Sequence, residues 1–290
     1  LGEVLVVYSL LNGVLYSSFV LVGDNFLMVW ICIELSALSL FPAYFVHSVA
    51  VNTYAALFYY YVVSSISSIM IVCGSIAEGL WFISFMGFAI KFGILPFSFW
   101  VYYVMLYSNW YVIWGFSVFL KIPVFLFPML FGAYQWLWLE VVLSLMFVML
   151  SLFFWLVNYN WVSCWTHMML SSTAVLVMLS LVSSVDVVLY VFSVYVIWGT
   201  LVMMFLSWCG GVFVSYWGLG VWFLYCVLLV STPLSISLFY KLVSVFGVSS
   251  CSVLFVVAWI FYSVSEQVYL ATWAINNNFY RYNSSFSTYL

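Results

Sequence analysis

The stretch FAIKFGILPFSFW, residues 88–100, places one charged residue and one helix breaker inside an otherwise apolar run. Lys91 stands among apolar and aromatic side chains, and Pro96 follows five residues later. A lysine at the centre of a membrane helix costs about 2.5–3.5 kcal/mol on insertion scales, and proline removes a backbone donor and clashes with the preceding turn. Neither residue suits a simple membrane crossing, so this stretch indicates a helix that is interrupted for a functional reason.

The whole chain of 290 residues is similarly apolar, with 69% hydrophobic and 4% charged residues, and its mean hydropathy is +1.29. A soluble domain averages about 25% charged residues. Apolar runs follow one another from end to end, each long enough to cross the roughly 30 Å hydrocarbon core as a helix. The short polar–apolar alternation of membrane strands is absent from the sequence. The composition therefore predicts an all-α, polytopic bundle of transmembrane helices.

Short connections containing Gly, Asn, Asp or Ser divide the chain into about ten predicted spans. These cover residues 4–22, 26–47, 54–74, 79–107, 109–131, 136–157, 161–182, 185–208, 212–246 and 251–274. Too little sequence lies between them to form a domain outside the membrane. We therefore expect a single transmembrane domain over residues 1–274 and a short polar C-terminal tail over 275–290.

Two predicted spans, 79–107 and 212–246, are too long for a single crossing, and they contain Pro96 and Pro233 respectively. In lipid, an interrupted helix persists only where protein or water covers its free backbone groups. Each of the two is the fourth span of its half of the chain, and paired interrupted helices are typical of inverted-repeat transporters. The pattern predicts antiporter-like inverted repeats with two broken helices.

Four charged residues lie well inside apolar spans: Glu34, Lys91, Lys121 and Lys241. Left unpaired, they would cost roughly 10 kcal/mol in total, comparable to the whole stability of a domain. A structural ion pair, or a lysine that reaches the interface, is one explanation, and a proton or ion path is the other. Glu266, late in the last span, is ambiguous because it is also within reach of the interface. The other charges fall near span ends or in connections: Glu3, Asp24, Glu78, Glu140, Asp186 and Arg281.

Lysine and glutamate together suit a proton relay. Burial favours the neutral amine of a lysine, whereas a nearby carboxylate favours its charged form. Glu34 is the mid-span carboxylate of the first half of the chain, so we expect it to pair with Lys91. A carboxylate that approaches or leaves Lys91 would push a proton on to Lys121. Under this hypothesis, replacing Glu34 by Gln changes proton transport.

Other chemistry has little support in the sequence. The six cysteines form no C-x-x-C pair, and the two histidines, His47 and His167, allow at most a single bis-His haem. No G-x-G-x-x-G, P-loop or G-x-S-x-G motif is present. Four basic residues are too few for a nucleic-acid-binding surface. We therefore expect no cofactor, no metal and no nucleic-acid partner for this chain.

An ordered set of motifs resembles a known family. KFGILPFSFWV (91–101) is similar to the K-x-G-x-x-P-F-H-F-W-V signature of mitochondrial NADH dehydrogenase subunit 2, an antiporter-like subunit of respiratory complex I. WICIELSAL (30–38) resembles the family's W-x-x-x-E-L-N segment, and FLKIPVF (119–125) resembles its Q-K-x-A-P motif. LSSTA (170–174) and TPLSISLFYK (232–241) resemble Y-S-S-I-A and P-P-L-x-G-F-x-x-K. The resemblance covers most of residues 1–245.

This sequence departs from the family pattern at several positions. Ser98, Ser36 and Leu120 stand where the family has histidine, asparagine and glutamine, and the histidine expected after residues 170–174 is missing. Lys241 is eight residues after the proline of its motif instead of seven. His167, on the same predicted span, is a substitute for that histidine or a packing residue. The chain is therefore identified as a divergent member of the family.

The resemblance implies a role in the membrane arm of complex I, in the mitochondrial inner membrane, among other membrane-arm subunits and lipids. It implies a subunit of a proton-translocating NADH:ubiquinone reductase, with no direct NADH site and no redox chemistry on this chain. Carried over, Glu34 and Lys91 would be the coupling ion pair and Lys121 the central relay. Lys241 would be the far-channel residue beside the second broken helix.

Three other interpretations stay open. The first is another antiporter-like subunit, of complex I or of a cation/proton antiporter complex. The second is an independent secondary transporter, which would be favoured by coupling-ion carboxylates at both helix breaks, where this chain has lysines. The third is a structural membrane-arm subunit that has lost pumping, for which Lys91 and Lys121 would be dispensable.

Overall fold

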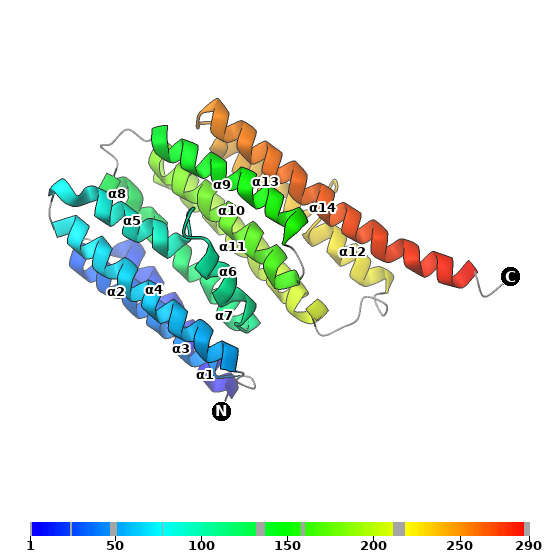
Figure 1. Cartoon of the computed structure of the whole chain (residues 1–290), viewed down its shortest axis with the longest axis horizontal. Helices are drawn as coiled ribbons and strands as arrows, with labels where there is room; N and C mark the ends of the chain where they lie inside the picture. Colours follow the sequence, from blue (N-terminus) through cyan, green and yellow to red (C-terminus); the bar gives the residue numbers. More distant parts are fainter. Residues whose placement is uncertain are drawn as a thin grey trace.

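A computed structural model describes residues 2–23, 25–46, 51–76, 78–131, 137–157, 160–210 and 218–286, and all regular secondary structure in these ranges is helical. The first half contains α1 (Gly2–Val22), α2 (Phe26–Ser39), α3 (Phe41–Tyr44), α4 (Val51–Ile76), η1 (Glu78–Leu80), α5 (Trp81–Phe92), α6 (Phe99–Leu106), α7 (Trp110–Val118), η2 (Phe119–Leu126) and α8 (Phe127–Phe131). The second half contains α9 (Leu137–Leu156), α10 (Trp161–Val182), α11 (Val185–Gly210), α12 (Leu219–Leu228), α13 (Ile236–Val248) and α14 (Val253–Phe286). Figure 1 shows the early helices on one side of the bundle and the late helices on the other.

Seven helices of the described ranges are long and apolar enough to cross a membrane. They span Gly2–Val22, Phe26–Tyr44, Asn52–Ile76, Leu137–Leu156, Trp161–Val182, Val185–Gly210 and Val253–Asn276. The chain is thus an all-helical, multi-pass membrane protein, as predicted. The described residues of the other three predicted spans, 79–107, 109–131 and 212–246, form shorter helices.

The central helix of the bundle is α10. Nearly all of its side chains between Ser163 and Ser180 are buried, and it contacts α6, α8, α9, α11, α13 and η2. A helix that is buried all round belongs inside a bundle, not at the lipid boundary. Its many hydroxyl side chains mostly bond to carbonyls of the preceding turn, as Ser171 does with Met168 (2.8 Å). The centre of the molecule is therefore apolar overall but lined with hydroxyl groups.

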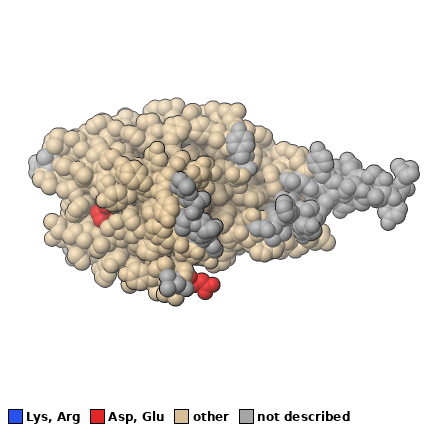
Figure 2. Space-filling model, turned by 60° about the horizontal axis from the view of Figure 1, so that its bottom comes forward, with Lys and Arg blue, Asp and Glu red and all other residues tan. Residues whose placement is uncertain are grey.

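Few charges reach the outer surface. Figure 2 shows a face that is almost wholly uncharged, with no basic side chain among its described residues. Three acidic residues lie in the first turns of their helices, Glu3 in α1, Glu140 in α9 and Asp186 in α11. Carboxylates are favourable at helix N-termini because they face the positive end of the helix dipole. The expected position of these residues near span ends is confirmed.

The polar C-terminal segment continues as helix. α14 extends to Phe286, so residues 275–286 belong to the same helix as the last predicted span. Asp24 and His47 lie outside the described residues.

Small residues let α4 and α5 approach closely. A Cβ added at Gly74 of α4 would lie 2.2 Å from the backbone nitrogen of Ser84 in α5. A Cβ at Gly87 would lie 2.7 Å from the carbonyl oxygen of Ser67. Small residues at such contacts are the usual means of helix association in membranes. This close contact fixes α5, and with it Lys91, against the first half of the bundle.

Replacing Gly74 by alanine should therefore destabilise the protein by about 1–3 kcal/mol, because the new methyl group meets backbone atoms that cannot rotate away. The measurement is thermal unfolding of the purified protein in mild detergent. Gly220→Ala is the matched control, since a Cβ at this helical glycine of α12 meets nothing within 4 Å. Equal unfolding midpoints for the two variants would contradict the close contact.

Candidate functional site

Lys91 and Glu34 form an ion pair between α5 and α2. The Lys91 Nζ lies 3.0 Å from the Glu34 Oε1, and the two side chains are 3% and 23% exposed. The predicted contact between these residues is confirmed. Lys91 is thus a buried cation whose carboxylate partner is the more accessible of the two.

The chain turns sharply directly after Lys91. Gly93 ends α5 with φ of 66°, a left-handed conformation that glycine adopts without strain. Ile94 donates its backbone N–H to the Ala89 carbonyl (2.9 Å), which satisfies one of the last carbonyls of the helix. The Trp100 indole of α6 donates to the Ile90 carbonyl (2.9 Å). Pro96 lies in the connection between α5 and α6. The hydrogen bonds of Ile94 and Trp100 to the end of α5 fix the two ends of this connection.

Lys121 lies in the 3₁₀ segment η2, which differs from the single continuous span over residues 109–131 that the sequence predicts. Its side chain is fully buried. The Nζ donates to the Met169 carbonyl (3.1 Å) and to the Ser172 hydroxyl, both on α10. It also lies 3.6 Å from the centroid of the Tyr195 ring on α11, in a cation–π contact. In the part of the chain that the structure describes, Lys121 has no carboxylate at ion-pair distance.

A small cavity connects Lys91 with Lys121. Both lysines line it, together with Trp100, Leu120 and Thr173 among others, and its volume is about 20 Å³. A water molecule needs roughly 10–15 Å³ of such space and a few polar partners. The cavity therefore has room for about one water molecule beside the two lysines, which belong to different helical elements.

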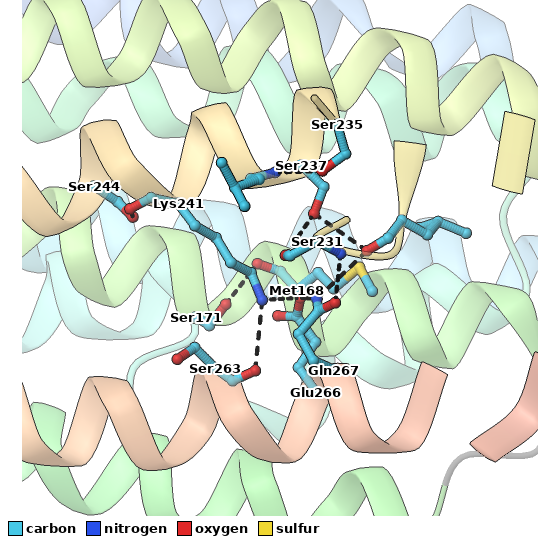
Figure 3. Close-up of polar contacts among 12 residues, drawn as sticks. Met168, Ser171, Ser231, Ser235, Ser237, Lys241, Ser244, Ser263, Glu266 and Gln267 are labelled. Carbon is cyan, nitrogen blue, oxygen red and sulfur yellow. Dashed lines mark hydrogen bonds and ion pairs between the residues drawn. The ribbon is translucent and has the colours of Figure 1, made fainter. Parts of the chain in front are cut away.

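Lys241 of α13 forms the second ion pair. Its Nζ lies 2.9 Å from the Glu266 Oε1 on α14, with side-chain exposures of 16% for the lysine and 6% for the glutamate. It also contacts the Ser263 carbonyl at 3.5 Å (Figure 3). From the sequence alone Glu266 lies either in the span or at the interface, and the structure places it inside the bundle.

Polar contacts extend from this pair to the α12–α13 connection, which contains Pro233 (Figure 3). The Gln267 Nε2 donates to the Glu266 Oε1 (3.0 Å), and the Gln267 Oε1 accepts from the Ser231 backbone N–H (2.7 Å). The Ser231 and Ser237 hydroxyls lie 3.1 Å apart, and Ser237 donates to the Leu229 carbonyl (3.2 Å). The connection between α12 and α13 is thus tied to the ion pair.

His167 is separate from the lysines. Its Nδ1 lies 2.6 Å from the Tyr102 hydroxyl, and its ring is surrounded by aromatic side chains such as Phe154. The Nε2 is buried and has no hydrogen-bond partner among the described residues. Among these residues no group of three or more His, Cys, Asp or Glu side chains is suited to hold a metal.

The comparisons with known proteins show the fold. No protein-family model and no curated protein sequence matches this chain. Among solved structures, it is similar to a chain of respiratory complex I from Thermus thermophilus with bound aureothin. The TM-score is 0.72 at 16% sequence identity, over 93% of this chain and 69% of that chain. At this identity the likeness establishes a shared helical fold.

Proposed function

We propose that this chain is a proton-translocating membrane-arm subunit of NADH:ubiquinone oxidoreductase, respiratory complex I. Protons would move through Glu34, Lys91, Lys121 and Lys241 while NADH oxidation and quinone reduction occur on other subunits. The observation that carries the proposal is the cavity that Lys91 and Lys121 share, with Glu34 paired to the first lysine. The similarity of this fold to that of a respiratory complex I chain supports the proposal that the protein assembles into such a complex. The assignment to subunit 2 and to the mitochondrial inner membrane rests on the sequence motifs.

In this proposal α5 with α6, and α12 with α13, are the two broken helices of an antiporter-like domain that covers residues 1–274. A lysine lies next to each break, Lys91 before the Pro96 connection and Lys241 after the Pro233 connection. The breaks would admit water and let a protonated side chain change partners without facing lipid. The partners would be other membrane-arm subunits and lipids.

An independent cation/proton transporter is the second candidate. The observation that favours it is the carboxylate paired with the lysine beside each break, Glu34 from α2 and Glu266 from α14, because carboxylates are suited to bind a coupling cation. The two candidates differ in whether the chain works inside a large assembly.

A native gel of mildly solubilised source membranes separates them. The gel is probed with an antibody against residues 276–290 and stained for NADH dehydrogenase activity. We expect the chain to migrate with the large NADH-oxidising band. Migration as a small separate species would contradict the complex I assignment and favour the independent transporter.

A further inference from the structure

We infer that Lys241 and Glu266 form a second switchable ion pair, in which Glu266 is the carboxylate that controls whether Lys241 holds its proton. The inference rests on the proposed function and adds a residue to it. The family resemblance gave a role to Lys241 alone, and it gave none to Glu266. The pair joins two different helices at 2.9 Å, as Lys91 and Glu34 do at 3.0 Å.

The two pairs are reversed in their exposure. In the first pair the lysine is 3% exposed and the glutamate 23%. In the second pair the glutamate is 6% exposed and the lysine 16%. The more exposed partner is thus the carboxylate in the first pair and the amine in the second.

Glu266 is surrounded by groups that transmit a change in its charge. On α14, Gln267 bonds to it and also holds the Ser231 backbone of the α12–α13 connection. Loss of the Glu266 charge would therefore weaken its ion pair with Lys241 and the Gln267-mediated contact with the α12–α13 connection.

In each cycle the Lys241–Glu266 pair takes up one proton and releases one proton. A proton that arrives at the Glu266 carboxylate forms an O–H bond and neutralises it. The Lys241 ammonium has then lost its counter-charge, so an Nζ–H bond breaks and the proton leaves to water on the accessible side. Transfer of the Glu266 proton to the Lys241 amine restores the ion pair. The charge of the pair is the same at the start and at the end.

The test compares Glu266→Gln with a matched control, Glu140→Gln, which neutralises a carboxylate in the first turn of α9. The assembled complex is reconstituted into vesicles, and NADH oxidation and proton uptake are recorded together. We expect Glu266→Gln to lower the proton-to-electron ratio measurably while Glu140→Gln leaves it unchanged. We also expect the exchanged pair, Lys241→Glu with Glu266→Lys, to recover part of the loss, because it restores an ion pair between the two helices.

If the single variant fails to assemble, the neutral pair Glu266→Gln with Lys241→Met replaces it, because it leaves no unpaired buried charge. A normal ratio in whichever of these variants assembles overturns the inference. Lys121→Met serves as the reference for the proposed function. If Lys121→Met lowers the ratio and Glu266→Gln does not, only the inference fails, and if neither lowers it, the proposed function fails as well.

Discussion

Replacing Lys121 by methionine should lower NADH-driven proton uptake at least about tenfold, because a positioned acid–base group typically contributes 10²–10⁴-fold to a proton transfer. Lys121 is buried between α10 and the Tyr195 ring, and it lines the cavity shared with Lys91. Methionine fills a similar volume without a charge, so the helix packing should persist. The measurement is the quenching of a pH-sensitive dye in vesicles that contain the assembled complex.

Lys121→Arg is the sharper control for this prediction. Arginine keeps the positive charge and the cation–π contact, but it does not release its proton in proteins. We expect the arginine variant to assemble and to transport as poorly as the methionine variant. Normal proton uptake with arginine at this position would mean that only the charge of Lys121 matters and that it does not pass protons.

Removing the carboxylate of Glu34 alone should destabilise the protein by roughly 3 kcal/mol, because it leaves the Lys91 cation buried without a partner. Removing both charges, in Glu34→Gln with Lys91→Met, should recover most of that loss. The measurement is thermal unfolding of the complex in mild detergent, for wild type, both single variants and the double variant.

The same four proteins distinguish a structural role of the Glu34–Lys91 ion pair from a role in proton transport. If the pair moves protons, the double variant is stable but its proton uptake stays low. A double variant that is both stable and fully active would show that Glu34 and Lys91 are a structural ion pair only.

The class of fold and one of the two ion pairs could be predicted from the sequence. Hydropathy and run length alone identify a helical membrane bundle, because a polar backbone in lipid must be satisfied within helices. The contact between Glu34 and Lys91 was predictable because the first half has one mid-span carboxylate to offset its buried lysines. The informative signal was the free-energy cost of burying charged side chains in apolar spans, and the helical periodicity of apolar residues contributed little.

The local structure at Lys121 and the partner of Lys241 could not be predicted in the same way. Residues 119–126 have the same hydropathy whether they form an α-helix or a 3₁₀ helix, so hydropathy does not distinguish the two structures. The last predicted span ends at residue 274, which places Glu266 near its end. In the structure α14 continues to Phe286, so Glu266 lies far from the end of the helix. Which side chains from different helices meet, here Lys241 of α13 and Glu266 of α14, depends on the tertiary packing of the whole bundle.

The most direct test of the proton path is the proton-to-electron ratio of the reconstituted complex, measured at matched rates of NADH oxidation. Wild type is compared with three separate variants, Lys91→Met, Lys121→Met and Lys241→Met. We predict that each variant lowers the ratio, because each removes one protonatable amine from the proposed path. A ratio equal to that of wild type in all three variants would contradict the account.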